Sequence, residues 1–233
     1  MSTTSDTLRE DHILADGTRV TLRFIQPDDA AELRRAFGRL SSRSRYQRFF
    51  ALMPDLTDDM IRYLTRVDGD KHLAIVATTD SLDLKSEIGL GVARYVRLDG
   101  EPEVAEAAVT VTDDAQGKGI GRLLVRALAR AARARGVHSF RGTVLSENVG
   151  MRHLLTEVGA KLYPVTMGGD PPYPPAQPGD GQTLVFDVAL DWPPEKDAEH
   201  PLRRLLRAAA ESLGLMPHGE VKPSPSESPA GEG

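Results

Sequence analysis

The 233-residue chain contains no cysteine. Disulfide frameworks, zinc sites built on thiolates and cysteine nucleophiles are therefore excluded. A chain without cysteine fits a reducing compartment, and we expect a cytoplasmic protein. The sequence also lacks any apolar run near the roughly 20 residues that a membrane-spanning helix needs, and residues 1–14 carry no apolar signal core. We therefore expect no membrane partner.

An excess of basic residues is missing as well. Lysine and arginine number 29 against 34 acidic residues, and the formal net charge is −5. Proteins that bind nucleic acid usually leave a basic footprint, so this balance argues against nucleic acid as the main partner. With 40% hydrophobic and 27% charged residues, the composition is that of an ordinary soluble globular protein. The length suits one substantial domain or two small ones.

Several segments have the apolar patterns typical of strands. They are residues 18–25, 72–79, 87–98, 103–112, 137–145 and 183–190. Helical spacing follows residues 27 and 57 and recurs over 120–136 and 146–159. Asp99-Gly100 predicts an antiparallel hairpin, and the helix after residue 120 predicts a parallel crossover. This order predicts an α/β (α+β) fold, with a mixed central sheet of six to seven strands flanked by helices.

A glycine-spaced turn, Gln116-Gly117-Lys118-Gly119-Ile120-Gly121, lies between a strand and an amphipathic helix. The first turn of a helix has free backbone N–H groups and partial positive charge, and glycine lets the backbone approach an anion closely. The segment therefore predicts a phosphate site, with a plain turn as the alternative. A Walker loop is excluded because no Ser or Thr follows the lysine. A dinucleotide fingerprint is excluded because its third glycine would fall at Arg122.

This turn and the order of elements resemble those of the GCN5-related N-acetyltransferases (GNAT). The matching residues are Gln116, Gly119 and Gly121, with Asn148 downstream. The resemblance covers about residues 18–190 and implies the GNAT fold, with acetyl-CoA as cosubstrate and no metal. The amino-acid sequences of residues 21–50 and 67–77 resemble those of a bacterial subgroup of this family, some members of which are protein-lysine acetyltransferases. Some members of that subgroup carry fused cyclic-nucleotide or acyl-CoA-synthetase-like domains, and from the length we expect none here.

The resemblance also implies which residues bind the cofactor. Backbone N–H groups from Gln116 to Arg122 would hold its pyrophosphate, and the exposed backbone of Val109 and Val111 would pair with its pantetheine arm. Asn148 would contact that arm, cap its own helix, or do both. The cofactor-binding candidates are therefore Val109, Val111, Gln116, Gly117, Lys118, Gly119, Ile120, Gly121, Arg122 and Asn148.

Glu106 is the candidate catalytic residue. An amine is protonated at neutral pH, so transfer to it requires a base. Glu106 lies among small residues before the glycine-spaced turn, and the resembling subgroup has a glutamate at this distance. An exposed strand glutamate is the alternative, and Glu103 is the fallback base. Many family members place a tyrosine acid where this chain has Leu155, so water or another group, such as Tyr163 or Tyr173, would protonate the thiolate.

We therefore expect an acetyl-CoA-dependent N-acetyltransferase that acts on a primary amine. The acceptor would be a protein lysine or a small molecule, and the protein would be a monomer or a homodimer. The alternative is a catalytically silent acyl-CoA-binding sensor. Residues 40–50 mix arginines with aromatics, which indicates either a face that binds an acidic partner or a short helix packed on the core.

The sequence also suggests where the parts of the chain begin and end. We expect a flexible N-terminus at residues 1–15 and the acetyltransferase domain at residues 16–192. A helical extension at residues 193–216 and a disordered tail at residues 217–233 would follow. Within the domain, prolines and glycines between residues 164 and 182 predict a long irregular loop.

Overall fold

The structure is a computed structural model that describes residues 7–81, 86–164 and 183–190. The chain divides into two units, and the described residues all belong to the first, Met1–Asp191. Residues 165–182 of the loop predicted for 164–182, the helical extension predicted for 193–216 and the tail predicted for 217–233 lie outside the described residues.

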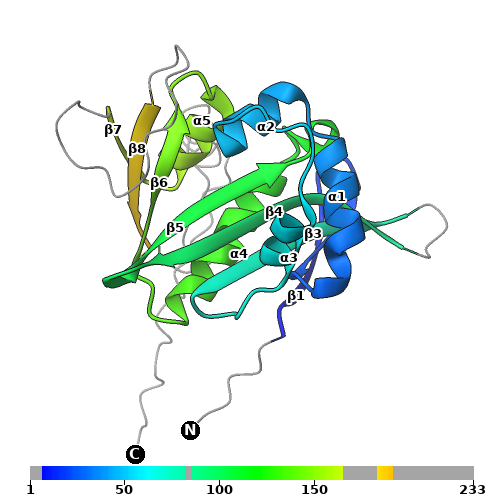
Figure 1. Cartoon of the computed structure of the whole chain (residues 1–233), viewed down its shortest axis with the longest axis horizontal. Coiled ribbons are helices and arrows are strands. Elements are labelled where there is room, and N and C mark those ends of the chain that lie inside the picture. Colours follow the sequence, from blue (N-terminus) through cyan, green and yellow to red (C-terminus); the bar gives the residue numbers. More distant parts are fainter. Residues whose placement is uncertain (1–6, 82–85, 165–182, 191–233) are drawn as a thin grey trace, which may run out of the picture. The chain divides into compact units, whose positions relative to one another are not determined.

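A mixed eight-stranded sheet forms the centre of this unit (Figure 1). Its order is β1-β2-β3-β4-β5-β6-β8-β7. Neighbouring strands are antiparallel except β5 and β6, which are parallel. The predicted mixed sheet is confirmed, although it has eight strands rather than six to seven. The strands are β1 Arg9–Ile13, β2 Arg19–Phe24, β3 His72–Asp80, β4 Glu87–Leu98, β5 Glu101–Val111, β6 Ser139–Leu145, β7 Lys161–Pro164 and β8 Thr183–Ala189.

The two additional strands lie at the two edges of the sheet. β1 falls inside the segment for which the sequence predicts a flexible N-terminus, so that prediction is wrong for Arg9–Ile13. β1 pairs along its length with β2, and the Thr21 hydroxyl donates to Asp11 at 2.6 Å. An edge strand covers little of the core, and Ile13 remains 77% exposed. Such strands therefore carry a weak apolar pattern.

Helices cover both faces of the sheet (Figure 1). α1, α2 and α3 lie on one face, whereas α4 packs on the other against β3, β4 and β5. None of the helices among the described residues is both long enough and apolar enough to cross a membrane. The helices are α1 Ala30–Gly38, α2 Ser42–Phe49, α3 Asp58–Thr65, α4 Ile120–Arg133 and α5 Val149–Glu157, with 3-10 turns at Pro27–Asp29 and Asp113–Ala115.

α4 carries the apolar stripe that the sequence predicts. Ile120, Leu124 and Leu128 are each at most 1% exposed. Burial of one such side chain contributes roughly 1.5–3 kcal/mol, so the stripe fixes α4 firmly on the sheet. Gly136, with φ +79°, reverses the chain just after the helix. The start of α4 is therefore held in place by the core below it.

α1, α2 and α3 share a second apolar cluster on the opposite face. Its buried members are Phe37, Leu40, Leu56, Ile61 and Leu64. Phe49 of α2 packs against this cluster, and its ring meets that of Phe37 edge to face, with centroids 5.8 Å apart. The interpretation of residues 40–50 as a short helix packed on the core is therefore confirmed for Phe49.

Candidate active site

The sheet opens between β5 and β6. Their parallel pairing extends only from Val104↔Ser139 to Glu106↔Arg141, whereas β5 stays paired with β4 as far as Val111↔Gly91. The far half of β5 therefore has a sheet partner on one side only. The two strands therefore splay apart beyond Glu106 and Arg141.

The backbone of β5 points into this opening at alternate residues. The N–H of Thr112 donates to the Leu90 carbonyl of β4 at 2.9 Å. Because successive residues of a strand direct their peptide groups to opposite edges, Val109 and Val111 direct theirs toward β6. The Val111 carbonyl accepts a hydrogen bond from the Gln116 side chain at 3.1 Å. Val109 is thus placed to pair with an extended ligand arm.

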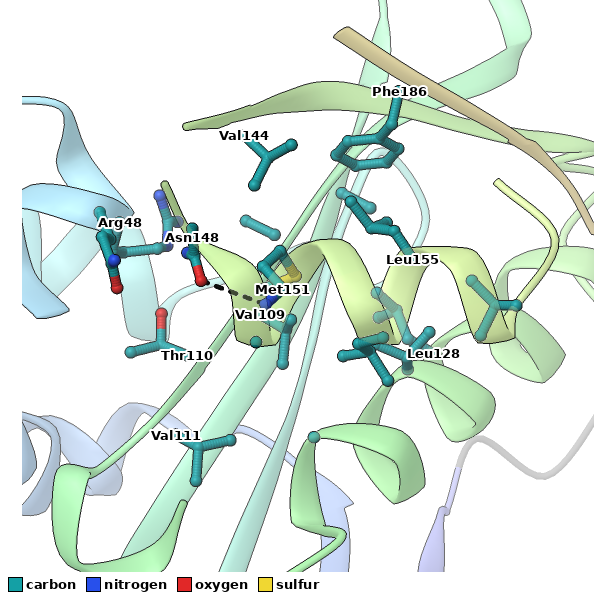
Figure 2. A pocket seen from close by; sticks show the side chains of 18 of the residues that line it. Arg48, Val109, Thr110, Val111, Leu128, Val144, Asn148, Met151, Leu155 and Phe186 are labelled. Carbon is teal, nitrogen blue, oxygen red and sulfur yellow. Dashed lines mark hydrogen bonds between the residues drawn. The ribbon is translucent and has the colours of Figure 1, made fainter. Parts of the chain in front are cut away.

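A cavity of about 310 Å³ occupies the opening (Figure 2). Residues of β5, the glycine-spaced turn, α4, β6 and α5 line it, and α2 closes one side. The cavity brings together most of the residues that the sequence predicts for the site. They are Glu106, Val109, Val111, Gln116, Gly117, Gly119, Ile120, Gly121 and Asn148.

Two predicted cofactor-binding residues, Lys118 and Arg122, are not among the residues that line the cavity. The Lys118 ammonium lies 3.3 Å from the Asp16 carboxylate. The Arg122 guanidinium donates to Glu157 of α5 at 2.6 Å. Their side chains are thus engaged with neighbouring acids, although their backbone N–H groups remain part of the turn.

The glycine-spaced turn has the geometry of an anion site. Gly117 and Gly119 have φ of +74° and +88°, a region that side chains other than glycine rarely adopt. Gly119 is the N-cap of α4, so the free N–H groups of the first helical turn follow it directly. Gly121 lies close to α5, because a Cβ there would be 3.5 Å from Leu154. The turn combines free donors with the positive end of a helix dipole.

Hydrogen bonds tie the turn to α2. The Asp113 carboxylate accepts from the Ser41 N–H at 2.8 Å and from the Ser41 and Ser44 hydroxyls at 2.9 and 2.8 Å. Gln116 donates to the Ser44 hydroxyl at 3.4 Å. Burial alone would raise the pKa of Asp113, but these donors outweigh it and lower that pKa. Asp113 therefore stays ionised and holds α2 over the cavity.

Glu106 lies on the face of β5 that is turned toward α2. The Val111 side chain lies 3.8 Å from where a Cβ on Gly121 of α4 would be, so the alternate side chains, Glu106 among them, face the other way. Glu106 is half-buried and lines the cavity. Glu103, the fallback base, does not line the cavity, and 68% of its side chain is exposed. Its carboxylate lies 3.4 Å from His138 Nδ1.

Sequence reasoning missed two arginines that lie near Glu106, Arg48 and Arg94. Arg48 of α2 lines the cavity, and burial lowers the pKa of its guanidinium, while the Glu106 charge opposes that shift. Arg94 of β4 is only 6% exposed and its guanidinium lies 3.0 Å from His72 Nε2. Burial and then the Arg48 charge lower the pKa of Arg94 to about 9, so Arg94 is charged at neutral pH. An arginine guanidinium keeps its proton in proteins, so Arg48 is a cation as well.

His72 is a neutral neighbour of Arg94. Burial and then the Arg94 charge lower the pKa of His72 to about 4. Its ring stacks at a tilt on Tyr63 of α3, with centroids 4.8 Å apart. Arg94 stands within the apolar run GVARYV (residues 91–96). A charged residue in such a run is the signal that would have revealed the buried pair of Arg94 and His72.

Asn148 caps α5, because its side-chain oxygen accepts from the Met151 N–H at 3.1 Å (Figure 2). Leu155 lines the cavity where many family members have a tyrosine. Tyr163 of β7 is 49% exposed and not among the lining residues, and Tyr173 lies outside the described residues. Within the described ranges, His, Asp and Glu form no group of three or more that could hold a metal ion.

Known proteins share this sequence pattern. Residues 19–161 match the family model described as an acetyltransferase (GNAT) domain. Acetyltransferase Pat from Mycolicibacterium smegmatis is 34% identical over 139 residues, which cover 60% of this chain and 40% of that protein. Acetyltransferase PA5475 from Pseudomonas aeruginosa is 30% identical over 146 residues, which cover 63% of this chain and 77% of that one. The chain thus matches well under half of the first relative.

Solved structures share the fold. The GNAT domain of S. lividans PAT superposes with a TM-score of 0.64 at 28% identity, over 77% of this chain and 97% of that one. The cAMP-binding acyltransferase from Mycobacterium smegmatis superposes with a TM-score of 0.52 at 25% identity, over 90% of this chain and 55% of that one. With a family model that spans more than half of its length, this chain belongs to the GNAT acetyltransferase family.

Proposed function

We propose that the protein is an acetyl-CoA-dependent N-acetyltransferase that transfers an acetyl group to a primary amine. The observation that carries this proposal is the joining of three features in one cavity. These are an open strand edge on β5, a glycine-spaced turn at the start of α4, and the Glu106 carboxylate. Membership of the GNAT family supports the same reaction.

The cofactor would occupy the opening between β5 and β6. Backbone N–H groups from Gln116 to Arg122 would hold its pyrophosphate, since a helix N-terminus favours anions. The peptide groups of Val109 and Val111 would pair with the amides of its pantetheine arm, as a neighbouring strand would. Asn148, whose side-chain oxygen already caps α5, would offer its amide group to the arm.

Glu106 would act as the general base. Its carboxylate takes a proton from the acceptor ammonium, and the freed amine attacks the thioester carbonyl carbon. The new C–N bond forms a tetrahedral oxyanion, which a backbone N–H of β5 would stabilise. Collapse of this intermediate breaks the C–S bond, and the thiolate leaves while the amide product gives up its second amine proton to solvent.

Leu155 leaves no tyrosine to protonate that thiolate at the usual family position. A thiol has an ordinary pKa of about 8.5. A thiolate is therefore a stable leaving group at mildly basic pH. Water at the open end of the cavity can then protonate the CoA thiolate. This scheme assigns no acid role to Tyr163, which is not among the lining residues.

Two variants on the same strand test the proposal. Glu106→Gln keeps the size of the side chain but removes the base, so we expect kcat to fall by about 10²–10⁴-fold, with the acetyl-CoA Kd unchanged in calorimetry. Glu103→Gln is the matched control, because that side chain is mostly exposed and outside the lining. Equal activity of Glu106→Gln and wild type would remove Glu106 from the mechanism.

The acceptor would be a protein lysine or a small-molecule amine. Mass spectrometry of a cell lysate incubated with the protein and labelled acetyl-CoA would detect lysine acceptors, and a panel of amines would detect small ones. The alternative function is a catalytically silent acyl-CoA-binding sensor. Tight acetyl-CoA binding without acetylation of any protein or amine would favour that sensor.

A further inference from the structure

Arg48 lies where two cavities meet. It lines the large cavity beside β5 and also a second one of about 80 Å³ between the sheet and α1 to α3. Figure 2 shows its side chain reaching from α2 toward the large cavity. The guanidinium carbon lies 4.9 Å from the centre of the Phe49 ring. The described residues offer this guanidinium no hydrogen bond and no ion pair, so it acts through its charge.

The register of the strands places a second cation beside Glu106. Glu106 pairs with Val96 of β4, and Arg94 lies two residues along β4 on the same face. Diagonal neighbours of this kind are roughly 7–8 Å apart. The Arg94 guanidinium is itself engaged with His72 Nε2 and the Leu64 carbonyl, and it is Arg48 that lines the large cavity together with Glu106.

Several charged or titratable groups near this pair, among the residues that the structure describes, are neutral or bound to other partners. His72 of β3 is neutral at pH 7, and Arg141 of β6 binds Glu101 and Asp187. The acids of the first helical segment that line the second cavity also have partners. Asp29 binds Arg23, while Glu32 binds Arg35 and Arg39. Tyr63 of α3 is a further titratable group that acts on Arg48.

We propose that Arg48 is a positioning residue that keeps Glu106 ionised and turned toward the acceptor, and so extends acetyl transfer to lower pH. This inference rests on the proposed role of Glu106 as the base. An arginine beside a carboxylate favours its charged form by about 1–3 pH units. The cation makes Glu106 a weaker base but leaves it ready to accept a proton over a wider pH range.

The pH profile of kcat/KM tests this role. In Arg48→Gln, the midpoint of the acidic limb should rise by at least about one pH unit. Arg48→Lys keeps the charge and should restore the wild-type profile. Arg43→Gln is the matched control, because Arg43 is exposed on the same helix. A fall in kcat/KM by one factor at every pH, with no movement of the midpoint, would show a merely structural role and overturn the proposal.

A second measurement does not depend on turnover. Carbon NMR of protein labelled at glutamate carboxyls follows the titration of each side chain, and Glu106→Gln identifies the Glu106 signal. We expect the Glu106 signal to titrate at a higher pH in Arg48→Gln than in the wild-type protein, because the loss of a nearby positive charge disfavours the carboxylate. Equal midpoints in the two proteins would overturn the role of Arg48. Wild-type protein that binds acetyl-CoA but acetylates nothing would instead refute the proposed function, while the titration would still decide the role of Arg48.

Discussion

Removal of the Asp113 carboxylate should loosen α2 from the cavity. The carboxylate accepts three hydrogen bonds from Ser41 and Ser44, at 2.8 to 2.9 Å. A typical hydrogen bond contributes about 0.5–1.5 kcal/mol to stability. Since these bonds lie near the surface, we take the lower end of that range for each. Asp113→Ala should therefore reduce the free energy of unfolding by about 1–2 kcal/mol, which urea denaturation measures directly.

The effect should depend on pH in a defined direction. The pKa of Asp113 is lowered in the folded protein, so its contribution is fully present above the ordinary aspartate value of about 3.9. It is lost as the pH falls through the folded pKa, and the two proteins should converge in stability there. Asp114→Ala is the matched control, because Asp114 is exposed on the same turn. Equal losses in Asp113→Ala and Asp114→Ala would refute the reasoning, as would a difference that persists in strong acid.

The remaining predictions concern the glycine-spaced turn and the buried histidine. Gly119→Ala places a side chain at φ +88° and should cost about 1–2 kcal/mol and weaken acetyl-CoA binding. Gly38→Ala, at a site with open space and ordinary φ, should keep both stability and binding, so equal calorimetric results for the two variants would contradict the assigned role of the turn. The pKa of His72 is lowered to about 4, so the free energy of unfolding should fall as pH drops from about 6.5 to about 4, where the folded protein must take up a proton. His72→Gln should flatten that part of the stability curve measured in urea, and an unchanged slope would count against the buried neutral ring.

Local patterns were enough to predict the glycine-spaced turn and the helix after it, where we propose that the cofactor binds. The apolar spacing of α4 and the glycines before it each lie within a few residues, so the sequence shows both directly. The hairpin at Asp99-Gly100 and the parallel crossover were also predicted and are confirmed. Edge strands β1 and β7 were missed, because pairing on one side stabilises them without a regular buried face.

The acceptor side of the site was much less visible in the sequence. Residues 40–50 gave two interpretations, and spacing alone did not show which arginine faces the sheet. Arg48 lies near Glu106 and Arg94 only because α2 packs against β5, and Asp113 helps to hold α2 there. Contacts between residues far apart in the sequence bring such a cluster together. A single sequence therefore shows the individual residues but not that they lie next to one another.

The short ladder between β5 and β6 also bears on the order in which the chain folds. β3, β4 and β5 are consecutive antiparallel neighbours, whereas β6 joins β5 only after the chain has passed through α4. Contacts between nearby segments form with less loss of chain entropy, so we expect the three-residue parallel seam to close late. A ligand that bridges β5 and β6 after they have paired adds interactions that are absent from the transition state of folding. Bound cofactor should therefore act mainly by slowing unfolding and should leave the rate of folding almost unchanged.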